Sequence, residues 1–459
     1  MRMSAAELAR VVDGTVEGDR DVTILGAEVD SRRLRENDIF VALPGARCDG
    51  HEFVPEALKT AAGALVRSDV ELPSPLDGRV LVRVADPLTA YHELARRVCQ
   101  ERQWKVVAIT GSVGKTTTKD FLAHLLADYR KIGASTGNRN STLGLPAEVL
   151  SQDAEIEIFV AEAGMSSPGE LAILGEILRP EILIYTLIAP VHTEFFPDLE
   201  AIVRAKAELI PWLDSDGTLV INAADPNQER FPSETGARVL RFGGIDSDAK
   251  LEDVEDLGLL GTRFRLVLPD GEAAVSLALP GRHQAENLLA AAAGATALGL
   301  GVAEIAAAVP TLRPAEHRGR VLTIADDISL VDDSYNASPV AMRRLLELLA
   351  QAPGRRVAVL GEMYELGELA AEAHRRVGEE AAASCDLLVA VGGADAAHLV
   401  GGARSTGFAE DCIHLVEDAR EAADLLNRLL HAGDVVLVKG SRGVGLDRTV
   451  ADLAGEEAA

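Results

Sequence analysis

Residues 104 to 126 read W-K-V-V-A-I-T-G-S-V-G-K-T-T-T-K-D-F-L-A-H-L-L. The apolar, β-branched run at 106–109 predicts a buried strand, and a helical pattern begins after residue 115. Between the two, Gly111 and Gly114 allow the backbone to turn so that successive N–H groups point inward at an anion. The N-terminus of the helix adds its partial positive charge at the same place. The order of strand, glycine loop and helix therefore predicts a site for the phosphates of ATP.

The side chains that follow the loop supply the groups that such a site needs. Lys115 would neutralise the β- and γ-phosphates, and the hydroxyl of Thr116 would bind Mg²⁺. The spacing is shorter than the usual G-x-x-x-x-G-K-[ST], because Ile109 stands where the first glycine is expected. An ordinary strand–helix turn is the alternative, but the flanking elements favour phosphate binding. The predicted phosphate loop comprises Gly111, Ser112, Val113, Gly114, Lys115, Thr116 and Thr117.

Composition excludes several classes of protein. The chain has 459 residues, which is too long for one core and predicts about three domains. It carries 45 Lys and Arg against 72 Asp and Glu, a net charge of −27, which argues against nucleic acid or an anionic membrane surface as a main partner, since both need a basic face. No apolar run reaches about 18 residues, and the N-terminus lacks the apolar core of a signal peptide. From these two features we expect no membrane insertion. Because the four cysteines are scattered, we expect reduced thiols in a cytoplasmic protein.

The order of strand and helix patterns predicts an α/β protein of three domains. Residues 1–103 form a small α/β unit. Residues 104–314 form a mostly parallel sheet with helices on both faces, and the segment 251–279 alternates like antiparallel strands. Residues 315–459 form a second doubly wound, Rossmann-like α/β domain.

Two polar clusters in the first domain are candidates for ligand binding. Asp30-Ser31-Arg32 closes one predicted strand, and Asp49-Gly50-His51 precedes a predicted helix. Ser31 and Arg32 have the groups to hold a diphosphate or the edge of a uracil. A Ser-Arg pair at the end of a strand is more often a solvated loop, so the residues by themselves leave both interpretations open.

Several polar residues follow the strands of the second domain. Glu162 ends an apolar strand beside the phosphate loop, where a metal ligand is expected, although a capping or salt-bridged glutamate is the alternative. His192 follows the next core strand at the carboxyl edge of the sheet, where sites form in α/β proteins, and we favour a role in the site over packing. Lys206 by itself is interpreted as a surface lysine. Further polar candidates are Asn138, Asn140, Ser141 and Thr142 in one loop, and His283 and Asn287 at the start of a helix.

Polar turns also follow three strands of the last domain and together outline a crevice. No single turn is decisive. The residues are Asp332, Asp333, Tyr335 and Asn336 at one strand end, Glu362 and Glu365 at a second, and Lys439, Ser441 and Arg442 at a third.

Taken together, these motifs resemble the Mur ligase superfamily, the ATP-dependent amide-forming enzymes of peptidoglycan precursor synthesis, and the resemblance covers essentially the whole chain. T-G-S-V-G-K-T-T-T is similar to the phosphate loop of the family, including its short spacing. The strings D-D-S-Y-N-A-S-P, L-G-E-M-Y-E-L-G-E, H-T-E-F-F…A-K-A-E-L and K-G-S-R-G resemble the branch that adds D-alanyl-D-alanine to UDP-N-acetylmuramoyl-tripeptide. The branch that adds meso-diaminopimelate or lysine carries D-Y-x-H-x-P, which is absent here.

The resemblance implies a role for each matching position. Lys115 and Thr116 would serve the phosphates and Mg²⁺, and Glu162 and His192 would be further metal ligands. Lys206 would carry a CO₂-derived carbamate that helps to hold a second Mg²⁺. Asn287, Arg318 and Asp333 would contact ATP, and Lys115, His192 and Lys206 would form the catalytic group. The incoming D-Ala-D-Ala would meet Tyr335, Asn336, Lys439, Ser441 and Arg442. The UDP substrate would meet Ser31, Arg32, Asp49, Gly50, His51, Asn138, Asn140 and Ser141.

Two strings depart from the family pattern. The family's N-x-N-N is N-R-N-S here, which affects the expected contacts of residues 138–141, and H-N-x-x-N is H-Q-A-E-N, which affects Gln284. The resemblance implies a bacterial, cytoplasmic and monomeric enzyme whose last domain closes over its substrates. Two other functions compete with this one: a Mur-type ligase for a different amino acid, and a nucleotide switch that hydrolyses ATP without ligation.

Overall fold

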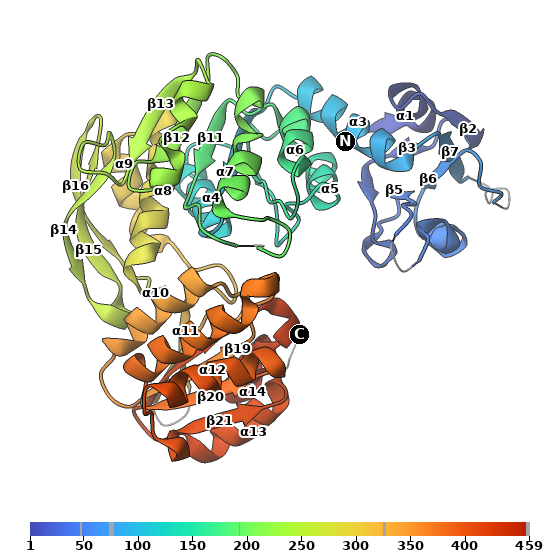
Figure 1. Cartoon of the computed structure of the whole chain (residues 1–459). Coiled ribbons are helices and arrows are strands. Elements are labelled where there is room, and N and C mark those ends of the chain that lie inside the picture. Colours follow the sequence, from blue (N-terminus) through green and yellow to red (C-terminus); the bar gives the residue numbers. More distant parts are fainter. Residues whose placement is uncertain (46–47, 73–77, 192, 325–326, 456–459) are drawn as a thin grey trace.

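Three principal sheets follow one another along the chain, with helices packed against them (Figure 1). The structure is a computed structural model that describes residues 1–45, 48–72, 78–191, 193–324 and 327–455. The sheet of residues 15–84 lies on one side of the central sheet, and the C-terminal sheet lies below it in the view of Figure 1. Within the described residues, no helix is long and apolar enough to cross a membrane. The expected three-part α/β fold is confirmed, and one principal sheet in each part supports the proposed domain division.

The N-terminal sheet has five strands in the order β2-β7-β6-β5-β4, parallel except for the β2–β7 pair. Two short strands, β1 and β3, form a separate antiparallel pair. The carboxyl ends of β4 and β5 lead into the two polar clusters. The elements are β1 (Met3–Ser4), α1 (Ala5–Val11), β2 (Thr15–Gly18), β3 (Thr23–Ile24), β4 (Gly26–Glu28), β5 (Asp38–Val41), α2 (Val54–Ala57), β6 (Gly63–Arg67), β7 (Val80–Val84) and α3 (Pro87–Glu101).

The central sheet is parallel throughout, in the order β13-β12-β11-β8-β10-β9. Its four inner strands are apolar runs buried on both faces, as a covered parallel sheet requires, whereas the edge strands are partly exposed. The predicted strand and helix around the phosphate loop are confirmed as β8 and α4. The elements are β8 (Lys105–Thr110), α4 (Lys115–Leu126), β9 (Ile132–Ala134), α5 (Gly144–Ser151), β10 (Ile158–Glu162), α6 (Glu170–Leu178), β11 (Ile182–Tyr185), α7 (Leu199–Ala207), β12 (Thr218–Asn222) and β13 (Arg238–Phe242).

The segment that follows forms the predicted antiparallel strands, as a separate three-stranded sheet packed beside helix α8. Helix α8 is rich in alanine, which has the highest helix propensity and lets helices approach closely. It packs against α4 over one face of the central sheet. The elements are β14 (Lys250–Asp256), β15 (Thr262–Leu268), β16 (Gly271–Leu277), α8 (Arg282–Ala297) and α9 (Val302–Ala308).

The C-terminal sheet has the order β17-β18-β22-β19-β20-β21 and is parallel except for the β17–β18 pair. Its strands alternate with helices, as expected for a doubly wound domain. The elements are β17 (Arg320–Ile324), β18 (Ile328–Asp332), α10 (Pro339–Ala350), β19 (Arg356–Gly361), α11 (Ala370–Ser384), β20 (Leu387–Val391), α12 (Ala394–Ser405), β21 (Ile413–Val416), α13 (Ala419–Leu429), β22 (Val435–Lys439) and α14 (Leu446–Ala454).

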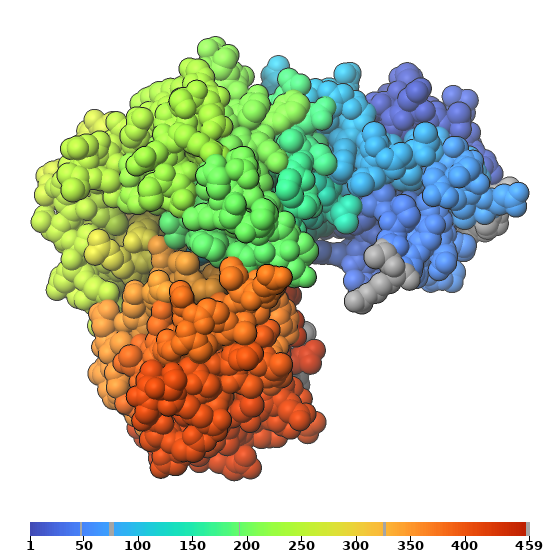
Figure 2. All heavy atoms as spheres, in the orientation of Figure 1, coloured from blue at the N-terminus to red at the C-terminus, as the bar shows by residue number. Residues whose placement is uncertain are grey.

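The hydrophobic cores are shared unequally among the three parts. One cluster of buried side chains has members between Met1 and Ala237 and is shared by the N-terminal sheet, helix α3 and one face of the central sheet. The opposite faces of these two sheets have clusters of their own. The C-terminal sheet has two clusters of its own, whose buried members all lie at or beyond Ile328. Figure 2 shows the same division at the surface, where the C-terminal lobe meets the central lobe and is set apart from the N-terminal lobe over most of this face.

Candidate active site

The phosphate loop joins β8 to α4, and two of its glycines have no room for a side chain. Gly111 has a φ of 146°, and a Cβ there would lie 2.0 Å from Oγ1 of Thr186. Gly114 has a φ of 93°, and a Cβ there would lie 2.3 Å from Oδ1 of Asn287. A side chain at either position would be strained and would clash. The close approach of Asn287 also brings helix α8 to the edge of the loop.

Hydrogen bonds from the neighbouring strand segment hold the loop open toward solvent. The amide of Ser112 donates to the carbonyl of Leu187 at 2.7 Å, and its hydroxyl donates to the carbonyl of Ala189 at 2.8 Å. The hydroxyl of Thr186 donates to the carbonyl of Val113 at 2.8 Å. The first-turn N–H groups of an α-helix have no partner within the helix, so the start of α4 presents them to an anion.

Glu162 ends β10 beside the phosphate loop and is 3% exposed. One carboxylate oxygen accepts a 2.7 Å hydrogen bond from the hydroxyl of Thr116, and the other accepts one of 2.6 Å from the amide side chain of Asn140. The backbone N–H of Glu162 donates to the hydroxyl of Ser135 at 2.9 Å. A buried carboxylate and a buried hydroxyl in contact with each other are hard oxygen donors of the kind that Mg²⁺ takes.

A magnesium ion bound here would need further ligands from the nucleotide and water. Within the described ranges no group of three or more His, Cys, Asp or Glu side chains is placed to hold a metal. Mg²⁺ bound with ATP commonly takes only one or two protein carboxylates and keeps phosphate and water oxygens, so the donor set fits. His192, the other predicted metal ligand, lies outside the described residues.

Two lysines lie close to Glu162. Burial lowers the pKa of the Lys115 amine, with a contribution from Arg318, while the charge of Glu162 opposes the shift. Burial lowers the pKa of Lys206 well below its ordinary value, and Lys115 adds to that effect. The interpretation of Lys206 as a surface residue was wrong, because it is 2% exposed. Helix α7 turns this face inward, and the carbonyl of Lys206 accepts a 2.7 Å hydrogen bond from the hydroxyl of the buried Tyr185.

The C-terminal sheet contributes a second set of polar groups. Lys439 is 2% exposed, and its ammonium group is paired with the carboxylate of Asp333 and donates to the carbonyl of Asn336 at 2.7 Å. The guanidinium of Arg318 lies over the ring of Tyr335 at 4.1 Å from its centroid. Arg442 lies 5.1 Å from the same centroid. One tyrosine ring is therefore contacted by two of the predicted substrate-binding arginines.

One cavity of about 540 Å³ brings the two sets together between the central and C-terminal sheets. Most of the site residues predicted in these two parts line it. Among the described candidates, Gly111, Thr142, Asp332 and Glu362 do not, and His192 lies outside the described residues. The predicted residues in its wall are Ser112, Val113, Gly114, Lys115, Thr116, Thr117, Asn138, Asn140, Ser141, Glu162, Lys206, Asn287, Arg318, Asp333, Tyr335, Asn336, Lys439, Ser441 and Arg442.

The cavity also contains residues to which the sequence assigned no role. Gln284 lies one helical turn before Asn287, and its buried Oε1 has no hydrogen-bond partner within the described structure. The i, i+3 spacing of the two residues on one helix was the signal that could have found it. Arg344 of α10 also lines the cavity and donates to the carboxylate of Glu286 on α8 at 2.8 Å, an ion pair between the two sheets' helices.

The candidate residues of the N-terminal sheet do not line this cavity. They follow β4 and β5, which are neighbours in the sheet, so they share its carboxyl edge. Arg32 makes a bidentate ion pair with Asp30 at 2.9 and 2.7 Å and is otherwise exposed. His51 is buried, with Nδ1 2.6 Å from Asp49 and Nε2 accepting from the amide of Arg67 at 2.9 Å. The ring of His51 therefore stabilises the loop rather than facing solvent.

Two family models match the chain over most of its length. One is described as the Mur ligase middle domain and matches residues 109–295, and the other, described as Mur ligase, glutamate ligase domain, matches residues 317–442. This chain belongs to the Mur ligase family. The middle-domain match contains the phosphate loop and Glu162, and the second match contains most of the residues that the C-terminal sheet contributes to the cavity.

Relatives of this Mur ligase match it from end to end. The UDP-N-acetylmuramoyl-tripeptide--D-alanyl-D-alanine ligase of Escherichia coli (strain K12) is 33% identical over 98% of each chain. The protein of the same name from Mycobacterium tuberculosis (strain H37Rv) is 35% identical, again over 98% of each chain.

Solved structures agree with the sequence relatives. MurF from Acinetobacter baumannii covers 99% of each chain with a TM-score of 0.89 and 27% identity. MurF ligase from Thermotoga maritima, determined in complex with ADP, covers 94% of this chain and 97% of its own, with a TM-score of 0.80 and 30% identity. The expected membership of the Mur ligase superfamily is confirmed by sequence and by fold.

Proposed function

We propose that this Mur ligase joins D-alanyl-D-alanine to the terminal carboxylate of UDP-N-acetylmuramoyl-tripeptide, with hydrolysis of ATP to ADP and phosphate. Relatives carrying that name match 98% of the chain at 33–35% identity. The observation that carries the proposal is the single cavity in which a phosphate loop, a buried carboxylate and a cationic group from the C-terminal sheet meet. A nucleotide switch would not need the third component.

The phosphate loop supports ATP binding on the central side of the cavity. Its backbone amides and Lys115 bind the phosphates, and Asn287 reaches the loop from helix α8. Arg318 and Asp333 contact the rest of the nucleotide from the C-terminal side. Gln284, whose side-chain oxygen has no partner among the described residues, lies in the same wall and is a further candidate for a polar contact.

The other two substrates approach from opposite sides. Lys439, Ser441, Arg442, Tyr335 and Asn336 receive the dipeptide. Ser31, Arg32, Asp49 and Gly50 hold the uridine diphosphate end of the long substrate, and the buried ring of His51 supports their loop. The peptide of the substrate then passes Asn138, Asn140 and Ser141 to reach the cavity. The exposed Arg32 and the shared edge of β4 and β5 support the first contact.

The chemistry requires activation because an oxide ion leaves a carboxylate too poorly for direct attack by an amine. The terminal carboxylate attacks the γ-phosphorus of ATP, ADP leaves, and an acyl phosphate results. The free amine of D-Ala-D-Ala then attacks the acyl carbon, phosphate leaves, and the amine loses its proton. Two anions must first approach each other, and in a chain of net charge −27 the half-buried Lys115 supplies local positive charge to screen them.

Mg²⁺, of which we propose two ions, supplies charge neutralisation of the phosphates and polarises the phosphoryl group. Thr116 and Glu162 are proposed ligands, together with His192 and a carbamate on Lys206. A carbamate forms from an amine in its neutral form and CO₂. The burial that lowers the pKa of Lys206 favours that neutral form, which supports the proposal.

The carbamate is tested by substitution and rescue. Lys206→Ala should lose most activity, and short carboxylic acids added to the assay should restore a part, because they place a carboxylate where the carbamate stood. Bicarbonate should not restore it, since the amine that CO₂ modifies is gone. Lys206→Arg serves as the control that keeps a cation and cannot be carboxylated; an active Lys206→Arg variant would overturn the carbamate.

The decisive assay measures phosphate release from ATP and Mg²⁺ with UDP-N-acetylmuramoyl-tripeptide, with and without D-Ala-D-Ala. Release that needs both substrates, together with a pentapeptide product by mass spectrometry, supports the ligase. Competition between D-Ala-D-Ala and single amino acids tests the rival ligase for another amine. Release that is indifferent to both substrates would support a nucleotide switch instead. We further propose that the enzyme is cytoplasmic and monomeric.

A further inference from the structure

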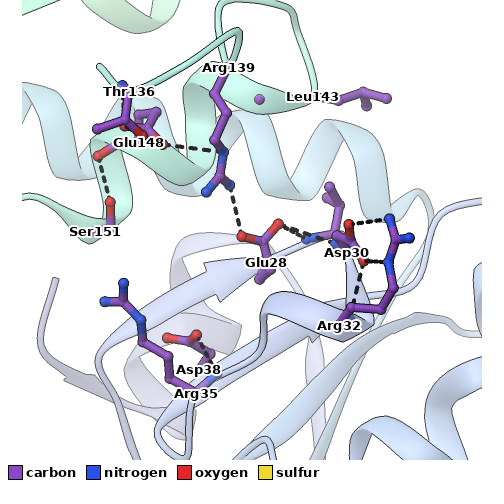
Figure 3. Close-up of polar contacts among 12 residues, drawn as sticks. Glu28, Asp30, Arg32, Arg35, Asp38, Thr136, Arg139, Leu143, Glu148 and Ser151 are labelled. Atoms are coloured by element: carbon purple, nitrogen blue, oxygen red, sulfur yellow. Dashed lines mark hydrogen bonds and ion pairs between the residues drawn. The ribbon is translucent and has the colours of Figure 1, made fainter. Parts of the chain in front are cut away.

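Arg139 lies between two buried carboxylates that come from different parts of the chain (Figure 3). Its Nη2 donates to Oε2 of Glu28, at the end of β4 in the N-terminal sheet, at 2.9 Å. Its Nε lies 3.2 Å from Oε1 of Glu148 on helix α5. The three side chains are 15%, 8% and 4% exposed, in the order Arg139, Glu28 and Glu148. The guanidinium is therefore a shielded bridge between the N-terminal and central parts.

On the N-terminal side, the bridge reaches the turn that we assign to the uridine diphosphate. The second oxygen of Glu28 accepts hydrogen bonds from the backbone N–H groups of Val29 at 2.9 Å and Asp30 at 3.2 Å. Asp30 in turn accepts from the backbone N–H and from the guanidinium of Arg32. Glu28 thus uses one oxygen to hold the turn and the other to hold Arg139.

On the central side, the bridge reaches the proposed metal site. Glu148 accepts the backbone N–H of Thr136 at 2.8 Å, which fixes the start of the loop that carries Arg139. The next residue after Arg139 is Asn140, whose side chain donates to Glu162 at 2.6 Å. The loop is therefore held at three points between the uridine turn and the carboxylate that faces the phosphates.

We propose that Arg139 is a positioning residue that sets the distance between the uridine-binding turn and the reacting end of the cavity. This inference rests on the proposed function, because it concerns how one long substrate reaches both places. A ligand that binds at two linked subsites gains affinity only when the spacing of the subsites matches its own length. Arg139 contacts neither end of the substrate and acts through Glu28 and Asn140.

The proposal predicts a specific pattern of binding constants. Glu28→Gln keeps the side-chain shape and an oxygen for the amides of Val29 and Asp30, but it turns a donor toward Arg139. Its affinity for UDP alone and for ADP should stay within about twofold of the wild type, since neither subsite is altered. Its affinity for UDP-N-acetylmuramoyl-tripeptide should fall about tenfold, because the variant loses part of the affinity gained when one ligand occupies two linked subsites.

Arg139→Lys and Arg139→Gln should show the same pattern, because a lysine cannot make the two forked contacts at once. The double variant Glu28→Gln/Arg139→Gln should be no weaker than the worse single variant, since both changes break one bridge. In turnover, KM for the tripeptide substrate should rise about tenfold, as the affinity falls, while KM for ATP stays unchanged.

Arg83→Gln is the matched control. Arg83 is a partly buried arginine of the N-terminal sheet that pairs with Glu17 at 2.8 Å within the same sheet. It should leave the ratio of the two uridine-ligand affinities unchanged, even if it lowers stability.

Calorimetric titration of each variant with UDP, ADP and the full substrate makes the measurement. Equal losses for UDP and for the full substrate, or the same pattern in Arg83→Gln, would overturn the positioning role. A wild type that binds the full substrate but shows no D-Ala-D-Ala-dependent phosphate release would refute the proposed function while leaving the bridge testable by binding. Glu28→Gln preserves volume, so a loss of folding in Arg139→Gln does not remove the test.

Discussion

The hydroxyl of Thr116 donates a 2.7 Å hydrogen bond to the carboxylate of Glu162, joining the first turn of α4 to the end of β10. The two residues are far apart in sequence, but β10 is the parallel neighbour of β8, with Glu162 opposite Ile109. The sheet therefore delivers the carboxylate to the place where the phosphate loop turns into its helix. The hydrogen bond fixes both side chains beside the start of the helix.

Thr116→Val keeps the shape of the side chain and removes its oxygen. We expect substrate-dependent phosphate release to fall by about 10- to 100-fold, as for lost metal-site partners, with a higher Mg²⁺ requirement. Thr116→Ser should retain most of the activity. Thr118→Val, on the same helix, removes a buried hydroxyl that has no partner within the described structure and should change activity less than twofold. A Mg²⁺ titration of all three variants makes the comparison, and equal effects at positions 116 and 118 would contradict the assignment.

Gly114→Ala tests the close approach of the loop to helix α8. The φ of 93° at Gly114 would strain an alanine, and its Cβ would lie 2.3 Å from Oδ1 of Asn287, which is a clash. We expect a stability loss of about 1–3 kcal/mol from the backbone alone, and in addition a large loss of ADP affinity. Gly299 has the same φ of 93°, and among the described residues no neighbouring side chain or backbone lies within 4 Å of the place that a Cβ would occupy, so Gly299→Ala carries the strain without the clash. Denaturant unfolding and ADP titration should separate the two; retained ADP affinity in Gly114→Ala would count against the loop assignment.

Asp333→Asn should leave the buried ammonium of Lys439 without its carboxylate. Removing one partner of a buried ion pair typically costs about 3 kcal/mol or more, whereas removing both costs less. We therefore expect the double variant Asp333→Asn/Lys439→Met to be more stable than Asp333→Asn. Urea unfolding followed by a probe in the C-terminal part gives the comparison. Strict additivity of the two single changes would mean that the pair is not coupled.

The buried His374 should make the C-terminal part sensitive to acid. Its Nε2 accepts the amide of Met363 at 2.8 Å and its Nδ1 lies 2.7 Å from the carbonyl of Ala370, so the neutral ring is the bound form. Burial lowers the pKa of His374 below its ordinary value of 6.5. The unfolded state therefore takes up a proton first, and the stabilisation present above pH 6.5 is lost as the pH falls toward the lowered pKa.

The measurement is the free energy of unfolding at several pH values between 7.5 and 5. The wild type should lose more stability over this interval than His374→Gln, which cannot titrate at that position. Identical slopes for the wild type and His374→Gln would refute the linkage.

Local patterns in the sequence predicted the parts of the site that depend on neighbouring residues. The strand, loop and helix of residues 104–126 are contiguous, so the apolar periodicity and two glycines were sufficient to predict these three elements. The ends of parallel strands gather at one edge of a sheet, which is why Glu162, Asp333 and Lys439 were correctly expected near a crevice.

The features of the site that could not be predicted from the sequence depend on tertiary packing. Lys206 is buried because of how α7 packs on the central sheet. The spacing of residues within the helix does not predict that burial. Arg139 stands 111 residues after its partner Glu28, and no local pattern in its own loop indicates this ion pair. Gln284 was set aside because it departs from the family string, although its helical position placed it in the cavity wall.

The core cluster that the N-terminal and central sheets share, with members between Met1 and Ala237, has a consequence for how the chain unfolds. Side chains that share one core lose their packing together, so the N-terminal and central parts should melt as one cooperative unit. The C-terminal sheet, with its two private cores, can melt at its own temperature. Three sheets would then give two calorimetric transitions rather than three, and a ligand that spans the cavity would merge them into one.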